Sequence, residues 1–151
     1  MEGYGYGIWL VYDQDIFNTP HLGHFTIACL MEDLNEAKQL FNEIINKFGN
    51  SLTIQIDKKY QIYETNIYKN DNNDILSWGY NGTCEKWNDL KLTCNPYTCS
   101  FSEEPHTSIQ YSKNPNLLRP YNYNEISTTI KCNIHLVNIK SDLPSDWFII
   151  I

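Results

Sequence analysis

One amphipathic segment, residues 32–48, constrains the fold of this chain more than any other feature of its sequence. Its apolar residues recur three and four positions apart and so form a single helical stripe of Leu34, Ala37, Leu40, Phe41, Ile44, Ile45 and Phe48. Asp33 suits the positive end of the helix dipole, and Gly49 is a helix-ending residue. The segment predicts one long helix, and the segments around it have a different period.

Strand-like patterns dominate the rest of the chain. We expect strands over residues 8–13, 24–30, 75–80, 106–112, 128–139 and 147–151, and a hairpin of two strands over 52–68 around the turn Asp57-Lys58-Lys59. Residues 82–104 are mixed and fit no single pattern, although 83–92 could be helical. Strand, strand, helix and then mainly strands indicates an α+β fold, and 151 residues fit a single domain spanning 1–151.

The charge balance narrows the possible partners. The chain has 18 acidic and 11 basic residues, a net charge of −7, and Arg119 is its one arginine. A protein that tracks a long nucleic acid needs many Lys and Arg side chains to displace counterions, so long DNA or RNA is not expected as a partner. A small anionic ligand is compatible with this charge, because a few local donors can bind it.

Targeting signals and a metal centre are not expected. We find no basic region followed by an apolar run and no membrane-spanning stretch, which predicts a cytoplasmic, intracellular protein without membrane contact. Five cysteines without an export signal favour reduced thiols. A zinc site built from Cys84, Cys94, Cys99 and His106 is an alternative, but their spacing is irregular.

Two short motifs of the form His-x-Ser/Thr carry the chemistry. They are His24-Phe25-Thr26 and His106-Thr107-Ser108, each at the start of a strand-like segment. Residues i and i+2 of a strand point the same way, roughly 7 Å apart, so each histidine shares a face with its hydroxyl. Phe25, Ile27, Thr107 and Ile109 would then point to the opposite face. If the two strands lie side by side, two imidazoles and two hydroxyls meet.

This set of groups suits phosphoryl transfer from a ribose phosphodiester. A neutral imidazole takes a proton from the attacking oxygen and a protonated one gives a proton to the leaving oxygen, and a histidine pKa near 6.5 allows both forms at neutral pH. Thr26 and Ser108 would hydrogen-bond the non-bridging phosphate oxygens. No metal or other cofactor is needed. The motifs do not say which histidine is the acid.

At these residues the sequence resembles the 2H phosphoesterase superfamily, also called LigT-like, whose members carry two His-x-Ser/Thr motifs. The resemblance implies a compact 2H fold with two antiparallel-sheet lobes around a central cleft and helix packing outside. It also implies metal-independent cleavage of cyclic or 2′-linked nucleotides. The family's second lobe usually has its own helix, which is not evident here, and Ser108 stands where Thr is common. Either hydroxyl can donate a hydrogen bond, so this difference preserves the chemistry.

The other two histidines are expected outside the site. His21 lies three residues before His24, which suggests a metal pair, but an extended loop gives these positions no shared face, so we interpret His21 as a solvent-exposed loop residue. His135 is followed two residues later by Val137 and lacks the hydroxyl. We interpret it as an ordinary sheet residue.

Aromatic residues and the arginine are candidates for substrate binding. A nucleobase could stack on tyrosine rings, and Arg119 could bind a phosphate or a base, although ordinary packing and surface roles are the alternatives for each. The candidate substrate-binding residues are Tyr4, Tyr6, Tyr111, Arg119 and Tyr121, with Tyr123 beside them.

The sequence therefore predicts a phosphodiesterase, a phosphoric diester hydrolase of the 2H type. Its small substrate would be a cyclic dinucleotide such as cyclic GMP-AMP, a 2′,5′-oligoadenylate or a 2′,3′-cyclic phosphate. Abundant Asn, Ile and Lys are typical of an AT-rich genome, and with the resemblance they suggest a viral antagonist of nucleotide immune signalling. The alternatives are a non-catalytic nucleotide-binding module of the same fold and a protein-interaction domain. The sequence does not give the oligomeric state.

Overall fold

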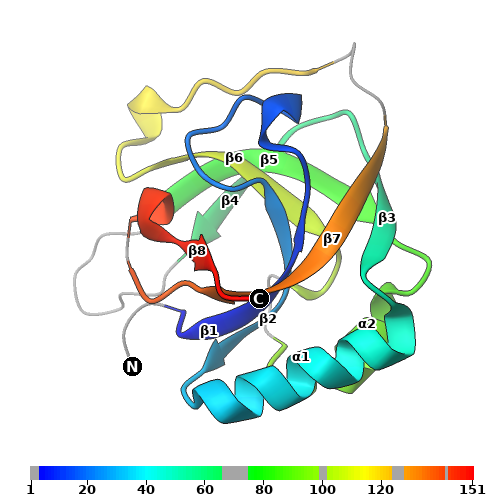
Figure 1. Ribbon diagram of the computed structural model, residues 1–151. Helices are drawn as coiled ribbons and strands as arrows, with labels where there is room; N and C mark the ends of the chain where they lie inside the picture. The colour runs from blue at the N-terminus through cyan, green and yellow to red at the C-terminus, as the bar shows by residue number, and fades with distance from the viewer. Residues whose placement is uncertain (1–3, 66–74, 99–101, 124–127, 142) are drawn as a thin grey trace.

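The computed structural model describes all residues except 1–3, 66–74, 99–101, 124–127 and 142, and it has an α+β architecture with an antiparallel sheet (Figure 1). The α+β class predicted from the sequence is confirmed. The strands are β1 (Tyr6–Val11), β2 (His24–Met31), β3 (Ser51–Ile56), β4 (Gln61–Thr65), β5 (Ile75–Thr83), β6 (His106–Ser112), β7 (Thr129–Asn138) and β8 (Phe148–Ile149). The helices are α1 (Leu34–Phe48) and α2 (Trp87–Cys94), with short 3-10 turns at 14–16, 115–117 and 144–146.

The sheet is organised around two groups of strands that β5 connects. Its order is β2-β1-β7-β3-β5-β4, with β6 also paired to β5 and β8 paired to β7. β5 pairs with β3 only through Gly82 and Thr83, whereas its first part runs between β4 and β6. β2, β1, β7 and β3 therefore form a first layer and β4, β5 and β6 a second layer.

Both helices pack outside the first layer (Figure 1). α1 begins where the Asp33 side chain accepts hydrogen bonds from two free backbone N–H groups, and it ends at Gly49 with φ 81°. Its buried residues belong to the predicted stripe: Ala37, Leu40, Phe41 and Ile44. α2 lies in the stretch whose pattern was ambiguous, and its short length and weak amphipathicity explain why the sequence alone did not identify it.

The predicted hairpin over residues 52–68 is wrong. β3 pairs with β7 and β5, whereas β4 pairs with β5, and the two consecutive strands are not hydrogen-bonded to each other. The connection Asp57-Lys58-Lys59 lacks the Asn-Gly or Gly residues that a tight hairpin turn requires. It instead carries the chain from the first layer to the second.

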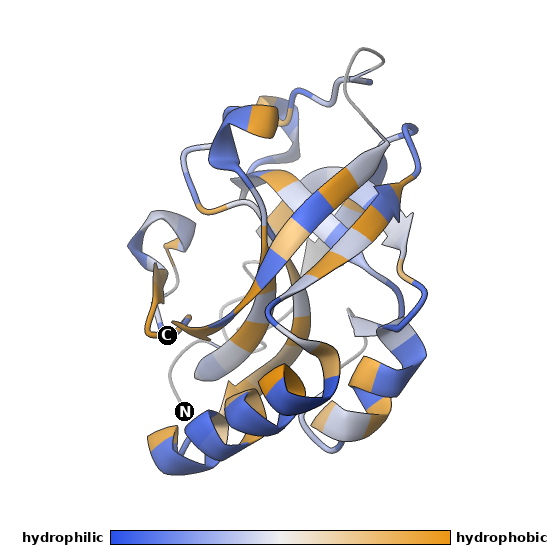
Figure 2. Ribbon diagram, turned by 45° about the vertical axis from the view of Figure 1, so that its right-hand side comes forward, coloured by the Kyte–Doolittle hydropathy of each residue, from blue (hydrophilic) through white to orange (hydrophobic). Residues whose placement is uncertain are grey.

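Two clusters of apolar side chains lie on opposite faces of the first layer. The main core sits under the helices and includes Ile8, Leu10, Phe25, Ile27, Ile134 and Leu136. The smaller cluster lies on the other face and contains Trp9, Cys29, Val137 and Ile139, with Trp147 packed against it. Alternating hydrophilic and hydrophobic residues along the strands are visible in Figure 2. The face of the first layer that carries the smaller cluster also carries His24 and Thr26 of the first motif.

Candidate active site

His24 and Thr26 share one face of β2, as the strand period predicts. In the pairing with β1, His24 is opposite Val11 and Thr26 is opposite Trp9, without a register shift between them. Phe25 lies between them and is wholly buried in the main core, on the other face. The first motif therefore presents an imidazole and a hydroxyl away from the helices.

The imidazole of His24 is enclosed and held in one tautomer. Its ring is stacked on Trp9, with centroids 3.5 Å apart and planes 5° from parallel, and the residue is only 6% exposed. Nδ1 is 2.6 Å from the carbonyl oxygen of Leu22. A carbonyl only accepts, so Nδ1 carries the proton and Nε2 has the free lone pair.

Burial also keeps His24 neutral. The pKa of His24 is lowered to about 3, mainly by loss of hydration; the hydrogen bond to Leu22 opposes this effect, and the nearby His21 and His106 add to it. At neutral pH this side chain is a proton acceptor, not a donor.

The second motif lies on β6, where a β-bulge rearranges the alternation. The register to β5 shifts between Trp78 and Gly79, so Gly79 is opposite Ser108 while Ser77 is opposite Tyr111. The bulge turns Tyr111 toward the face of Ser108, although three positions separate them. Regular alternation would have placed these two side chains on opposite faces.

Gly79 makes this bulge possible. A Cβ at this position would lie 1.7 Å from the backbone oxygen of Thr107, a distance that no side chain tolerates. The Thr107 side chain turns to the other face, where its hydroxyl is 2.6 Å from the hydroxyl of the buried Tyr12. Close backbone approach at Gly79 thus fixes where the second motif points.

Ser108 belongs to a cluster of three hydroxyl groups. Its Oγ is 3.0 Å from Oγ of Ser77, and its side chain also hydrogen-bonds Tyr111. Burial raises the pKa of Tyr111 to about 12, and the Ser108 hydrogen bond opposes that rise, so the phenol is protonated at neutral pH. Ser77 and Ser108 are 1% and 5% exposed. The cluster supplies several O–H donors beside the second motif.

His106 has a more open setting than His24. It is half-buried, opposite Asn81 on β5, and its ring centroid is 4.6 Å from that of Tyr63. The Tyr63 hydroxyl donates to Oδ1 of Asn81 over 2.5 Å. Burial, followed by the charge of Glu104, raises the pKa of Tyr63, which keeps this phenol neutral.

His21 connects the two motifs, and its predicted exposure to solvent is wrong. The residue is 5% exposed, and its Nε2 donates to the carbonyl oxygen of Ser108 over 2.9 Å. Its ring lies 6.1 Å from that of His24 and 5.1 Å from that of Tyr111, centroid to centroid. The loop before β2 folds inward because this hydrogen bond satisfies the buried imidazole. β2 and β6 lie against each other here without sharing a strand pairing.

Of the other predicted residues, the structure brings two to this region. Tyr4 and Tyr111 both contact Trp147, which covers His24. Tyr6 instead packs against the main core, with the Lys140 ammonium 4.2 Å above its ring.

Arg119 and Tyr121 lie in the loop after β6. The guanidinium of Arg119 donates to the carbonyl oxygens of Asn116 and Leu118 in its own loop. Tyr121 is 61% exposed and makes an edge contact with the ring of Tyr123. These side-chain contacts lie within the loop itself, so they give Arg119 and Tyr121 no part in this site.

Sequence reasoning missed three residues of the site, namely Trp9, Ser77 and Trp147. Trp9 lies opposite Thr26 in the pairing of β1 with β2, on the same face as Val11. The alternation of β1 together with the expected pairing of β1 and β2 could therefore have placed Trp9 beside the first motif. Ser77 is a lone hydroxyl within the apolar segment ILSWGY. Trp147 reaches the site only through the tertiary fold, and no local signal identifies it.

The fourth histidine and the described cysteines show no sign of a further catalytic or metal site. His135 is on β7, and its Nδ1 donates to the carbonyl oxygen of Ile151, which agrees with the predicted role as a sheet residue. Cys29, Cys84, Cys94 and Cys132 are not in disulfide bonds, whereas Cys99 lies outside the described residues. Within the described part of the chain, no group of three or more His, Cys, Asp or Glu could hold a metal ion.

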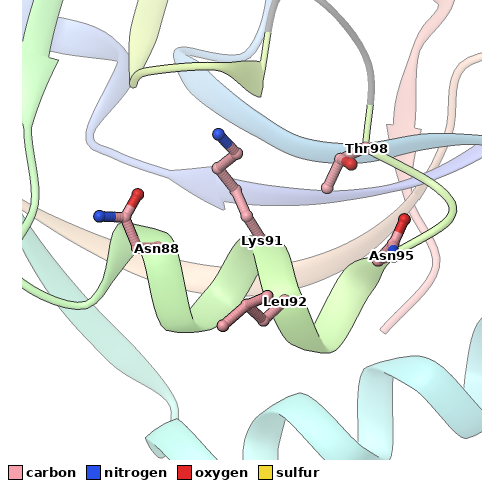
Figure 3. A pocket seen from close by; sticks show the side chains of 5 residues that line it. All are labelled: Asn88, Lys91, Leu92, Asn95 and Thr98. Carbon is pink, nitrogen blue, oxygen red and sulfur yellow. The ribbon is translucent and has the colours of Figure 1, made fainter.

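A shallow pocket of about 380 Å³ lies on α2 and contains none of the predicted site residues (Figure 3). It is lined by Asn88, Lys91, Leu92, Asn95 and Thr98. Lys91 is engaged with Glu103, donating to its carbonyl oxygen at 3.2 Å. The lining contains no histidine, carboxylate or thiol that could act together with Lys91 or Thr98, so we assign this pocket no catalytic role.

The described helices include none that is long and apolar enough to cross a membrane.

The site combines a neutral imidazole of fixed tautomer, a second imidazole and a group of hydroxyls at the contact of β2 and β6. Comparison of the chain with protein-family models, with curated proteins and with solved structures finds no match.

Proposed function

We propose that this protein is a metal-independent phosphodiesterase that cleaves a small cyclic or 2′-linked nucleotide with two histidines, as in the 2H phosphoesterases. The observation that carries the proposal is the meeting of both His-x-Ser/Thr motifs, from strands far apart in the sequence, at one contact between the two layers. His21 bonds directly from the loop of the first motif to Ser108 of the second. Two accidental motifs have no reason to meet in this way.

The surroundings of the histidines favour one division of roles. Nε2 of His24 has a free lone pair, and the ring is neutral at pH 7, so this imidazole is in the protonation state that the proton acceptor needs. It takes the proton of the attacking hydroxyl or water as the new phosphorus–oxygen bond forms. His106 gives a proton to the leaving oxygen as the old phosphorus–oxygen bond breaks. After product release, transfer of a proton from His24 through water to His106 restores both.

Hydroxyl groups would stabilise the charge that builds on the non-bridging oxygens. Thr26 shares the face of His24, and Ser108 lies with Ser77 and Tyr111 on the other side of the site. Donors held in place before the reaction stabilise the transition state without reorganisation. The chain places neutral donors here, with no arginine among them, which suits a phosphodiester of single charge better than a highly charged phosphate.

The substrate is proposed to be a short signalling nucleotide, by the chemistry of the site and the charge of the chain. With a net charge of −7, the chain repels a long polyanion but accepts one or two phosphodiesters in a site of hydroxyls and imidazoles. Cyclic dinucleotides, 2′,5′-oligoadenylates and 2′,3′-cyclic phosphates all fit this description. An antagonist of nucleotide immune signalling is the biological role that such a substrate suggests.

The rival that a specific observation favours is a nucleotide-binding module without turnover. His24 is enclosed between Trp9 and Trp147, and an enclosed imidazole cannot reach a phosphate in this conformation. A pure binder, however, has no need for two histidines in complementary settings.

Incubation with cyclic dinucleotides, 2′,5′-linked oligoadenylates and 2′,3′-cyclic nucleotides in the presence of EDTA separates these functions. Products resolved by ion-exchange chromatography support the phosphodiesterase. Retention of a nucleotide in equilibrium dialysis without product identifies the binding module. Neither cleavage nor retention of any member of the panel would reject both functions.

A further inference from the structure

Trp147 lies among four aromatic rings that belong to other parts of the chain. Its ring centroid is 6.3 Å from that of Tyr4, 5.7 Å from Trp9, 5.9 Å from His24 and 5.8 Å from Tyr111. All four contacts are edge-on, with planes 70–85° apart. We call Tyr4, Trp9 and Tyr111 the aromatic box. The box adjoins both motifs, because Trp9 stacks on His24 and Tyr111 bonds Ser108.

The segment that carries Trp147 has few other anchors near the indole. The indole N–H donates to the carbonyl oxygen of Ser141 within the same segment. Beyond the indole, Phe148 and Ile149 pair with β7, and the backbone of Ile150 and Ile151 bonds Leu136. Leu143 and Phe148 are 57% and 53% exposed. The chain is thus anchored on β7 beyond the indole, whereas the residues around Trp147 are largely exposed, so the indole can leave by a local rearrangement that keeps residues 150 and 151 in place.

While Trp147 is in place, the chemistry of the site is covered. His24 and Trp9 are 6% and 1% exposed. The indole N–H of Trp9 is also the one wholly buried side-chain polar atom that lacks a hydrogen-bond partner among the described residues. Such an unsatisfied donor is rare in a native protein and calls for an explanation, which a functional site can supply.

We propose that the aromatic box is a subsite for a nucleobase and that Trp147 fills it as an intramolecular plug, which a nucleotide must displace to reach His24. The identity of the base as occupant rests on the proposed function. An indole and a purine are both flat, two-ring π systems with polar edges, so a box that accepts one accepts the other. Displacement of Trp147 also exposes the imidazole of His24 to solvent.

Adenosine is the probe that tests the box without the phosphodiesterase chemistry, because it has a base and no phosphate. Its affinity is measured by isothermal titration calorimetry for the wild-type protein and for Trp147→Ala. We expect the variant to bind adenosine at least about tenfold more tightly, since no side chain competes for the box. Free indole added to the variant should refill the box and compete with adenosine.

Phe148→Ala is the matched control, because it alters the adjacent, exposed residue of β8 and leaves the indole in place. It should bind adenosine as the wild type does. Adding Tyr4→Ala to Trp147→Ala should abolish the gain, since it removes one wall of the box. If Trp147→Ala does not fold, Trp147→Leu keeps an apolar side chain without a stacking ring and gives the same comparison.

Two results would overturn the inference. Weaker adenosine binding by Trp147→Ala than by the wild type would mean that the indole helps to hold the base and is no plug. Absence of adenosine binding by a folded Trp147 variant would mean that the box is not a nucleobase subsite. Failure of the proposed phosphodiesterase would look different, because adenosine would bind while no nucleotide of the panel is cleaved.

Discussion

The two histidine motifs differ more in their surroundings than in their sequences. His24 is sandwiched against Trp9, bonded through Nδ1 to a backbone carbonyl and 6% exposed. His106 is half-buried, beside the ring of Tyr63 and opposite Asn81. The first imidazole lies in the interior of one layer and the second at a more open strand of the other. Similar motifs therefore lie in unequal surroundings.

This difference teaches that the roles in such a site come from the tertiary environment. The two-residue period of a strand places each hydroxyl on the face of its histidine. Because this period is the same in both motifs, it cannot distinguish the roles of the two histidines. Desolvation and the hydrogen bond of Nδ1 to Leu22 keep His24 neutral, with the lone pair on Nε2, which is the basis for proposing it as the proton acceptor. Each of the following predictions tests one side of this contrast.

The largest expected effect is on catalysis. His24→Ala and His106→Ala should each lower kcat about 10²–10⁴-fold for the nucleotide that the wild type cleaves, because each removes one proton transfer. Single-turnover cleavage followed by chromatography measures the rates. His135→Ala is the matched control and should retain activity, because that imidazole bonds the carbonyl oxygen of Ile151 outside the site. A His24→Ala enzyme with the wild-type rate would refute the role of the buried imidazole.

The next effect is on stability as a function of pH. The pKa of His24 is lowered in the folded state to about 3, so below its unfolded pKa near 6.5 the unfolded chain binds a proton that the folded one does not. The contribution of His24 is complete above pH 6.5 and is lost as the pH falls. Between pH 7 and pH 5, proton binding to His24 in the unfolded chain should lower the free energy of unfolding by about 2 kcal/mol.

Urea denaturation of the wild type and of His24→Gln at both pH values measures this loss. The variant lacks the titrating ring, so its stability should fall by about 2 kcal/mol less over the same interval. Equal losses in the two proteins would show that His24 is not desolvated, and the contrast with His106 would disappear.

A smaller effect is expected at the connection between the motifs. His21→Ala removes the hydrogen bond to the Ser108 carbonyl and should destabilise the protein by about 1–2 kcal/mol. Thermal unfolding at pH 7 provides the measurement. Lys113→Ala, at an exposed position after β6, serves as the reference and should change stability by less than about 0.5 kcal/mol. If both variants unfold alike, His21 does not join the two layers.

The smallest effect is expected on the His106 side. Tyr63→Phe keeps the ring beside His106 but removes the hydroxyl that bonds Asn81, so it should cost about 0.5–1 kcal/mol of unfolding free energy. Chemical denaturation measures that cost. Tyr60→Phe, on a tyrosine whose ring contacts Trp78 instead, provides a matched change. A loss at Tyr63 above about 3 kcal/mol would show that this side is as tightly built as the His24 side.

Local patterns predicted most of the elements and the shared faces of the motifs. The apolar stripe of α1 and the alternation of β2 depend only on residues close together in the sequence, so they could be predicted. The bulge at Gly79 could not be predicted, because it depends on how β5 and β6 approach each other. The same holds for His21, whose burial requires the carbonyl of Ser108 from a distant strand.

The longest-range features of the site were the least predictable. Trp147 follows the first motif by more than a hundred residues and lies over it only because β8 pairs with β7. The false hairpin over 52–68 has a related cause, since β3 pairs with the distant β7, which leaves β4 to pair with β5, the next strand along the chain. Sequence periodicity specifies faces, whereas tertiary pairing decides which faces meet.

The most direct test of a shared site is a double-mutant cycle in kcat. If His24 and His106 act on one phosphate as an acid and base pair, His24→Ala/His106→Ala should lose no more activity than the more damaging single variant. Independent contributions would instead multiply, so that the double variant loses the product of the two single effects. The first result is the one that the account predicts, and the second would contradict it.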